Sequence, residues 1–419
     1  MSAKPRVAVV GAGFAGLETA FHLRHLLGSR VDLTLVSDRG TFLFKPNTIY
    51  IPFGEDPSRF VLALDRPTSR KKIEFVRSPA RAIDFAARRI ETESRDVDYD
   101  WLVLATGAAM RPEEIPGLSR HAMTLWTPEE MIRLREAYAA LVERARDGRR
   151  QDLLFLVPPG NKCSGPLYEM VLMTDTWLGR KGAREAVRMT WATYEGGFIQ
   201  AFGPRLDAVV ADEFAARGIE GHKGLTVSAV EPGRVLFADG SSLPYDLLVS
   251  FPPYVAKERF AGLPLDERGF IRVEAGSRRV QGHDAVYAVG DAADFPVKQA
   301  FLALLQGDAA AEDLAARIDG RAPKFEFEPV SMCVMEELDK ATFAQVPLRY
   351  TGDPMRPVAV DVEDEERYLV GVSPLWRLGK KVLGYYLPWR FGSGEPFHAG
   401  IAWDAMDLGL RAMSKVLAR

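Results

Sequence analysis

The sequence is poor in the residues that build disulfide scaffolds, zinc sites and nucleic-acid surfaces. It holds two cysteines in 419 residues, too few for a disulfide scaffold, so these two are either incidental or chemically used. Its six histidines show no metal-ligand spacing, and we expect no metal site. The net charge of -3 argues against a nucleic-acid binder that works through a basic face.

Long apolar runs are also absent. No run approaches the roughly 18 residues that a membrane-spanning helix needs. The start, Met1 to Arg6, lacks the apolar core of a secretory signal and leads directly into a predicted strand. With 47% hydrophobic and 26% charged residues, the composition is that of an ordinary globular protein of two or three domains.

What is present begins with a glycine-rich turn. The β-rich run 6–10 enters Gly11-Ala12-Gly13-Phe14-Ala15-Gly16, and an amphipathic helix follows to about residue 27. In such a turn the first glycine permits the bend, the second lets a pyrophosphate approach and the third lets the helix pack on the sheet. The phosphates then lie at a helix N-terminus, where unpaired N–H groups favour negative charge. Ser37 and Asp38 end the next predicted strand, and we expect them to reach the ribose hydroxyls.

Two later stretches also pair a buried strand with a turn of small residues. Residues 99–104 lead into Ala105-Thr106-Gly107, and residues 284–289 lead into Gly290-Asp291, with a helix beginning near Lys298. An acid at a strand end suits the ribityl chain and flavin edge. With the glycine turn, these stretches resemble the FAD-binding pattern of two-dinucleotide-domain flavoproteins. A domain that binds only NAD would not explain the two later stretches.

The fold class predicted from these patterns is α/β. We expect two Rossmann-like doubly wound domains: an FAD-binding domain from residues 1–114 and 263–320, and a second domain from residues 115–262. A C-terminal region, 321–419, follows. Within the second domain the predicted strands are 152–157, 187–194, 225–230 and 245–251, and the predicted helices are 164–180 and 204–217.

The turn from Pro158 to Glu169 lies where such an enzyme would hold its second nucleotide. Its glycines are not at G-x-G-x-x-G spacing, and Lys162 and Cys163 lie between Gly160 and Gly165. The turn therefore looks suited to presenting a thiol, and the dipole of the following helix should lower the pKa of Cys163. A buried structural cysteine is the alternative that the stretch leaves open.

The C-terminal region predicts amphipathic helices. Apolar residues recur at helical spacing, with aromatic and basic residues between them, as in a helix pair that lies in a membrane interface. A dimerisation or core-covering helix pair is the alternative. The two apolar series are Leu375, Leu378, Val382 and Tyr386, and then Met406, Leu410, Met413 and Leu417.

At this point the chain resembles sulfide:quinone oxidoreductases and, more distantly, the flavoprotein subunit of flavocytochrome c sulfide dehydrogenases. The match runs nearly end to end. It is carried by Val36-Ser37-Asp38-Arg39, Phe44-Lys45-Pro46-Asn47, Cys163-Ser164-Gly165-Pro166, Val297-Lys298-Gln299, Cys333 and Gly394-Glu395-Pro396-Phe397.

The resemblance implies a role for each matching residue. Cys163 and Cys333 would form a redox-active disulfide or polysulfide bridge that hydrosulfide attacks. FAD would take the electrons and pass them to membrane quinone, leaving polysulfide or sulfane sulfur. Glu169 would be the base, and Lys298 would stabilise negative charge at the flavin. The resemblance adds Lys45, Ala80 and Arg390 as cofactor contacts, and Phe44, Pro46 and Phe391 as quinone contacts.

Departures from the family pattern keep alternatives open. Trp126 stands where many members have a third cysteine, and Glu130 and Gln200 stand at positions of histidines. A type II NADH:quinone oxidoreductase shares the fold, but it needs the second glycine fingerprint that is missing here. An electron-transfer subunit with a cytochrome partner is a further alternative. We expect a peripheral, monotopic protein on the cytoplasmic side of a prokaryotic membrane. Whether it forms a homo-oligomer is open.

Overall fold

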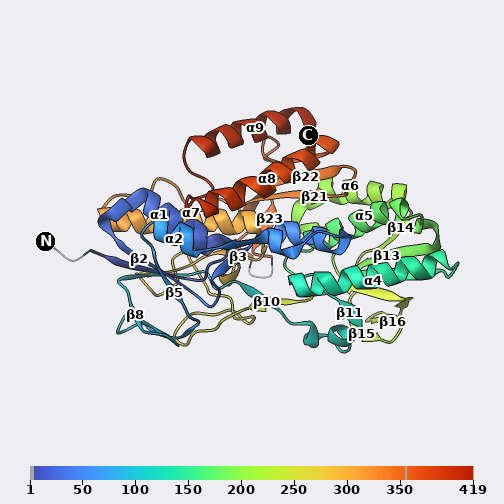
Figure 1. The fold of residues 1–419 in the computed structure, drawn as a ribbon, viewed down its shortest axis with the longest axis horizontal. Coiled ribbons are helices and arrows are strands. Elements are labelled where there is room, and N and C mark those ends of the chain that lie inside the picture. Colours follow the sequence, from blue (N-terminus) through green and yellow to red (C-terminus); the bar gives the residue numbers. More distant parts are fainter. Residues whose placement is uncertain (1–3, 354–355, 419) are drawn as a thin grey trace.

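The computed structural model describes residues 4–353 and 356–418. Residues 1–3, where the predicted FAD-binding domain and the stretch without a signal core begin, lie outside this part, as does residue 419. The fold is α/β, as expected, with two parallel sheets and a C-terminal region whose helices lie along one side of the molecule (Figure 1).

The first parallel sheet is assembled from distant parts of the chain. Its order is β20-β9-β1-β2-β5, so the late strand β20 lies beside β9. Helices α1 (Phe14–Leu27) and α7 (Ala300–Asp319) pack against each other, and the Thr19 hydroxyl donates to the carbonyl of Gly307 at 3.4 Å. The strands are β1 (Arg6–Val10), β2 (Asp32–Ser37), β5 (Glu74–Arg77), β9 (Trp101–Leu104) and β20 (Val286–Ala288).

The second parallel sheet has the order β11-β18-β12-β13-β14. Helices α4 (Pro128–Arg146), α5 (Gly165–Arg180) and α6 (Gly203–Arg217) accompany it. Buried apolar runs explain its central strands, because β12 and β13 are covered on both faces. The strands are β11 (Ala122–Met123), β12 (Gln151–Val157), β13 (Val187–Thr193), β14 (Ile219–His222) and β18 (Leu247–Ser250).

The predicted elements of this second region match the structure within a few residues, but helix α4 was not predicted. Its start is defined by a capping box. The Thr127 hydroxyl accepts from the Glu130 N–H, and the Glu130 carboxylate accepts the N–H groups of Trp126 and Thr127, both at 2.8 Å. Glu130 is therefore engaged in capping the helix.

Smaller antiparallel units surround the two sheets. β10 (Ala108–Met110) pairs with β19 (Tyr254–Ala256), which joins the two regions, and β3 (Thr41–Leu43) pairs with β4 (Val61–Ala63). Three-stranded meanders are formed by β6 (Ala80–Asp84), β7 (Arg89–Thr92) and β8 (Val97–Asp98), and by β15 (Val227–Glu231), β16 (Arg234–Phe237) and β17 (Ser242–Pro244). Short helical segments include η2 (Lys45–Phe53), α2 (Asp65–Arg70), α3 (Leu118–His121) and η7 (Gly290–Ala292).

The C-terminal region is an antiparallel sheet followed by two helices. Cys333 lies in β21 (Val330–Glu336), which pairs with β22 (Ala341–Tyr350), and β22 also pairs with β23 (Val358–Val360) and β24 (Leu369–Ser373). Helices α8 (Pro374–Gly392) and α9 (Ile401–Leu417) follow and lie together at the top of Figure 1. No helix among the described residues has the length and apolar character needed to cross a membrane.

The two predicted apolar helix faces differ in exposure. On α8, Leu375, Leu378 and Val382 are exposed as an interfacial helix requires, but Tyr386 is buried and Tyr385 is the exposed residue in its place. On α9 the predicted face turns inward, and Met413 packs against Gly379 of α8. The half-buried methionines and leucines of α9 cover α8 and β24, as in the core-covering alternative, and the interfacial prediction for α9 is not confirmed.

Candidate functional site

The glycine turn between β1 and α1 has the geometry that a dinucleotide requires. Gly11 has φ +107, and a Cβ there would lie 2.2 Å from the Ala105 carbonyl oxygen. A Cβ at Gly16 would lie 1.9 Å from the Gly11 carbonyl oxygen, so both positions exclude a side chain. At Gly13 a Cβ would meet nothing within 4 Å. The space beside Gly13, at the start of α1, is thus open and leaves room for a pyrophosphate at this helix N-terminus.

The turn of small residues at 290–291 lies against the glycine turn at 11–16. Gly290, with φ +65, follows β20, and a Cβ there would lie 2.8 Å from the Cβ of Ala15. Burial raises the pKa of the adjacent Asp291, while the lysines at 298 and 45 favour its charged form. The structure therefore brings the 11–16 turn, Ala105 and the 290–291 turn together, as the sequence predicted for a flavin site.

Other predicted cofactor residues lie at or near the ends of strands. Ser37 is buried at the end of β2, where its hydroxyl accepts the N–H of residue 39 at 3.3 Å. Asp38 is ion-paired with Lys257 at 3.0 Å, which leaves its second carboxylate oxygen for a ribose. Ala80 begins β6 and can offer only backbone groups, and Thr106 and Gly107 follow β9 directly.

Two lysines lie near Asp291, of which Lys298 is buried and Lys45 is half-buried. The Lys298 ammonium lies 3.8 Å from the centroid of the Phe270 ring and donates to the carbonyl of Ala293. The Lys45 ammonium lies 3.0 Å from the centroid of the Trp126 ring. Burial lowers the pKa of each lysine to about 7, although Asp291 favours the charged form of both. An anionic cofactor edge would favour the charged form of both lysines.

The cysteine turn is held in place by backbone and amide contacts. The Asn161 side-chain oxygen accepts the Cys163 N–H at 2.9 Å, and its side-chain nitrogen donates to the carbonyl of Phe251 at 2.7 Å. The carbonyl of Lys162 accepts the Lys298 N–H at 3.1 Å. The cysteine turn thus connects the second sheet to the segment at Lys298, which follows the 290–291 turn.

The structure brings Cys333 to this turn. A Cβ at Gly165, the first residue of α5, would lie 3.9 Å from the Cys333 sulfur. Cys163 is two residues before Gly165, and the charge of its thiolate raises the pKa of the Cys333 thiol, after the larger effect of burial. Both thiols are free and half-buried. Two cysteines far apart in sequence therefore share one site.

The predicted electrostatics of Cys163 were wrong. We expected the α5 dipole to lower the pKa of the thiol, but burial, with smaller contributions from the carboxylates of Asp291 and Glu195, raises it to about 12. The cost of burying a thiolate exceeds the stabilisation from the helix N-terminus. A proton acceptor is therefore needed if this thiol is to react as a thiolate.

Glu169, the predicted base, lies in a buried ion pair. Its carboxylate accepts from the Lys380 ammonium and from the Glu336 N–H at 2.8 Å. Lys380 also donates to the carbonyl of Val334 at 2.8 Å, and burial lowers the pKa of this lysine to about 7. The hydrogen bonds of Glu169 thus join α5 to β21 and α8, and among the described residues none of them is to a cysteine.

A different carboxylate, not singled out from the sequence, lies beside the cysteine turn. Glu195 follows β13 and is 8% exposed, and the Ser164 hydroxyl donates to it at 3.4 Å. The signal that could have found it is topological. β12 and β13 are parallel neighbours with Val157 opposite Thr193, so residues that follow them lie at the same sheet edge.

The predicted quinone residues are mostly buried. Phe44 is 6% exposed, Pro46 is half-buried in η2, and Phe391 is fully buried between Phe21 and Phe42, at ring distances of 5.8 and 5.3 Å. Arg390, the predicted cofactor contact on α8, donates instead to the carbonyls of Pro396 and Ala399. Both α8 residues therefore anchor this helix to the rest of the protein.

Histidine spacing did not reveal a buried cluster between α1, α7 and the loop after α8. Asp308 accepts from His22 at 2.7 Å and from His398, and Glu18 accepts the N–H groups of Phe397 and His398. The two histidines hold the pKa of Asp308 well below its usual range despite its burial. Burial and the neighbouring Asp308 raise the pKa of Glu18. This cluster fastens the C-terminal loop to the nucleotide-binding helix.

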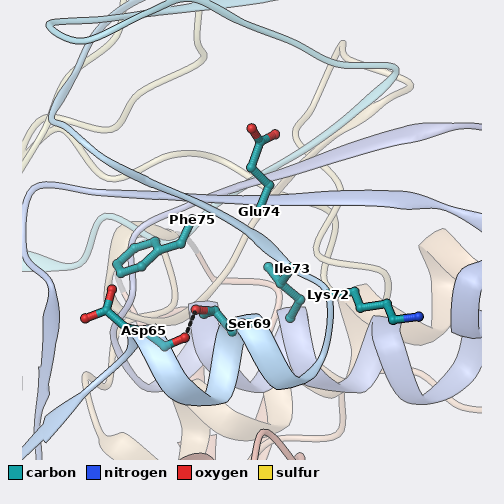
Figure 2. A pocket seen from close by; sticks show the side chains of 7 residues that line it. Asp65, Ser69, Lys72, Ile73, Glu74 and Phe75 are labelled. Atoms are coloured by element: carbon teal, nitrogen blue, oxygen red, sulfur yellow. Dashed lines mark hydrogen bonds between the residues drawn. The ribbon is translucent and has the colours of Figure 1, made fainter.

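An open hollow elsewhere is not part of this site. It has a volume of about 540 Å³ and lies between α2 and β5, with Asp65 and Phe75 at one end and Lys72 at the other (Figure 2). None of its lining residues belongs to the predicted cofactor or cysteine sites.

Comparison with known proteins supports the arrangement. The chain is 29% identical over 259 residues to a sulfide-quinone reductase of Aquifex aeolicus (strain VF5), covering 59% of this chain and 57% of that protein. It is 26% identical over 329 residues to the external alternative NAD(P)H-ubiquinone oxidoreductase B2 of Arabidopsis thaliana, covering 69% of this chain and 54% of that protein. The matches thus span little more than half the length of these relatives.

The fold agrees over nearly the whole chain with one solved structure. The sulfide:quinone oxidoreductase of Aquifex aeolicus superposes with a TM-score of 0.85 at 22% identity, covering 98% of this chain and 96% of that one. The resemblance seen in the sequence is thereby confirmed, and FAD is the cofactor of this fold. Residues 5–142 and 183–307 match the pyridine nucleotide-disulphide oxidoreductases, and the chain belongs to this family.

Proposed function

We propose that this protein oxidises sulfide through Cys163 and Cys333 and passes the electrons through FAD to a membrane quinone. The observation that carries the proposal is the approach of Cys333 to the start of α5, where its sulfur lies 3.9 Å from a Cβ at Gly165. Because the two cysteines are far apart in the sequence, this approach supports their use as a pair. A relative named sulfide-quinone reductase supports the choice of substrate.

The chain's own residues provide the sulfur chemistry. Hydrosulfide attacks a bridge between the two cysteines, so that one sulfur–sulfur bond forms as another breaks and one cysteine leaves as thiolate. FAD, when bound, would accept two electrons from the cysteine persulfide and thiolate that this attack leaves. Lys298 and Lys45, each with a pKa lowered to about 7 by burial, lie close enough to Asp291 to respond to charge in the crevice. Lys298 is the residue we assign to stabilising negative charge there.

The quinone and the membrane are assigned to helix α8. Its exposed face carries a group of large apolar or aromatic side chains, and such a patch marks an interaction surface. These residues are Leu375, Leu378, Val382, Tyr385 and Trp389. A hollow of about 540 Å³ lies between α8 and α9, lined by Lys381, Val382, Tyr385, Tyr386, Trp389 and Met406. Amphipathic helices of this kind bind in the interface of a membrane. We propose peripheral attachment on the cytoplasmic side.

NADH oxidation is the second candidate, because several relatives carry NAD(P)H in their names. The turn that would hold the nicotinamide dinucleotide argues against it. A Cβ at Gly160 would lie 3.1 Å from Pro253 and 3.5 Å from the guanidinium of Arg268, so its backbone is already covered. A pyrophosphate needs close approach to glycine backbone at this position.

Anaerobic flavin bleaching separates the two candidates. The FAD-loaded protein is mixed with micromolar sulfide or micromolar NADH, and absorbance of the oxidised flavin is followed by stopped flow. We expect fast bleaching by sulfide and restoration of the oxidised flavin by a short-chain quinone without a haem partner. Fast bleaching by NADH with none by sulfide would overturn the proposal. A need for a cytochrome in place of quinone would indicate an electron-transfer subunit.

A further inference from the structure

Glu195 and Cys163 occupy the same edge of the second sheet. Cys163 follows β12 and Glu195 follows β13, and the two strands run in parallel register from Gln151 and Val187 to Val157 and Thr193. Ligand sites in such sheets form at this carboxyl edge. A carboxylate at the end of the neighbouring strand is thus in the place from which it can act on the cysteine turn.

The carboxylate of Glu195 is buried and aimed at that turn. One oxygen accepts from the hydroxyls of Ser164 at 3.4 Å and Thr193 at 3.1 Å, and the other accepts the Gln200 N–H at 3.1 Å. Ser164 directly follows Cys163 in the chain. Because no lysine or arginine pairs with Glu195 among the described residues, its charge is held only by these neutral donors.

Electrostatics joins Glu195 to the thiol. Burial raises the pKa of Glu195 to about 7, despite the donors, and its charge raises the pKa of Cys163. Proton acceptors work best with a pKa near the working pH. The titratable groups that face either residue are Tyr168, Tyr194 and Asp207 around Glu195, and Asp291, Tyr254 and Cys333 around Cys163.

We propose that Glu195 accepts the proton of the Cys163 thiol through the hydroxyl of Ser164, as a positioning residue of the sulfur site. The thiol gives its proton to the Ser164 oxygen while the hydroxyl proton moves to the Glu195 carboxylate. A thiolate and a neutral carboxylic acid result, and no electrons are transferred. The role of this step in catalysis rests on the proposed sulfide oxidation. The coupling between the Cys163 thiol and the Glu195 carboxyl does not depend on that proposal.

The coupling is measurable without sulfide. In FAD-loaded Cys333→Ser protein, Cys163 is the only thiol, and its alkylation by iodoacetamide is followed by mass spectrometry from pH 5.5 to 9.5. If the thiol and the carboxyl interact, the rate rises tenfold per pH unit below about pH 7, rises less steeply while Glu195 ionises, and then resumes its steeper rise. The bend arises because the new negative charge of Glu195 raises the pKa of the Cys163 thiol. An independent thiol would give an unbroken rise.

Three variants assign the bend in this profile. Glu195→Gln is expected to abolish it. Glu220→Gln, an exposed carboxyl on neighbouring β14, is the matched control and should keep it. Thr193→Val removes a donor that favours the charged carboxylate, so the bend should move to higher pH. This last shift identifies Glu195 even if Glu195→Gln loses FAD, and it separates Glu195 from Asp291.

Sulfide-driven bleaching then tests the use of the step. Glu195→Gln should slow flavin reduction about 100-fold near neutral pH, as loss of a proton acceptor does. A profile that bends equally in wild type, Glu195→Gln and Thr193→Val would overturn the proposal, as would the absence of any bend. If sulfide does not bleach the wild-type flavin, the proposed function fails, while the alkylation profile still decides the role of Glu195.

Discussion

Replacing Lys380 by methionine should cost the folded protein about 3–5 kcal/mol, because the Glu169 carboxylate would be buried without a counter-charge. The two side chains are 9% and 8% exposed, so water cannot take the place of the ammonium. Methionine retains most of the aliphatic volume of lysine, so cavity formation contributes little. The carbonyl of Val334 also loses its donor, which adds to the loss.

Adding Glu169→Gln to Lys380→Met should restore most of the stability, to within about 1–2 kcal/mol of the wild type. The amide oxygen at position 169 can still accept the Glu336 N–H, now at 2.8 Å from the carboxylate, and no buried charge remains. Glu169→Gln alone should cost less than Lys380→Met alone. Burial has already lowered the pKa of Lys380 to about 7, so an unpaired lysine escapes the penalty by losing its proton.

The measurement is urea unfolding of the FAD-loaded protein at pH 6.5, below that pKa, followed by tryptophan fluorescence and flavin release. Lys381→Met, at the exposed next residue of α8, is the matched control and should change stability by less than about 0.5 kcal/mol. A Lys380→Met protein within 1 kcal/mol of the wild type would refute the reasoning. Normal sulfide bleaching by the stable double variant would show that Glu169 is an anchor and not the base.

Three further outcomes follow from contacts described above. Cys163→Ser and Cys333→Ser should each abolish sulfide-driven bleaching with FAD retained, and the double variant should lose no more, since either change breaks the bridge; near-normal turnover of either single variant would end the cysteine mechanism. Leu378→Glu with Tyr385→Glu should release the protein from liposomes and slow quinone reduction more than flavin reduction; unchanged flotation with liposomes would rule out the α8 surface as the attachment site. Glu18→Ala leaves two buried N–H groups of the loop after α8 unpaired and should cost about 2–5 kcal/mol in thermal unfolding.

Much of the flavin crevice was predictable, because its residues are dictated by backbone geometry. Gly11 and Gly16 admit no Cβ, and such positions leave a fixed spacing in any sequence. The carboxyl edge of a parallel sheet is equally regular, so the turn with Cys163 could be placed from the run 152–157 alone. The partner Cys333 could be assigned only by family resemblance, because the sequence of β21 contains no pattern that indicates which part of the protein it contacts.

The electrostatics were not predictable, since they depend on burial and on partners distant in sequence. The Cys163 thiol was expected to have a lowered pKa, but its enclosure outweighs the helix dipole. Glu169 was predicted to be a base, but in the structure it pairs with Lys380, which is 211 residues away in sequence. What covers the apolar face of α9 was not predictable for a related reason: helical periodicity shows that a helix has an apolar side, not whether protein or membrane covers it.

The order of strands in the first sheet has a consequence for biosynthesis. β9 ends at Leu104, but its neighbour β20 begins only at Val286, and helix α7 is later still. At about 5–20 residues per second, a ribosome needs on the order of 10–40 s to supply the missing strand. During that interval the nascent chain carries an unpaired, apolar edge strand, which is a template for aggregation. We expect a chaperone to shield β9 during translation, and the flavin to be captured only after residue 319 has left the exit tunnel.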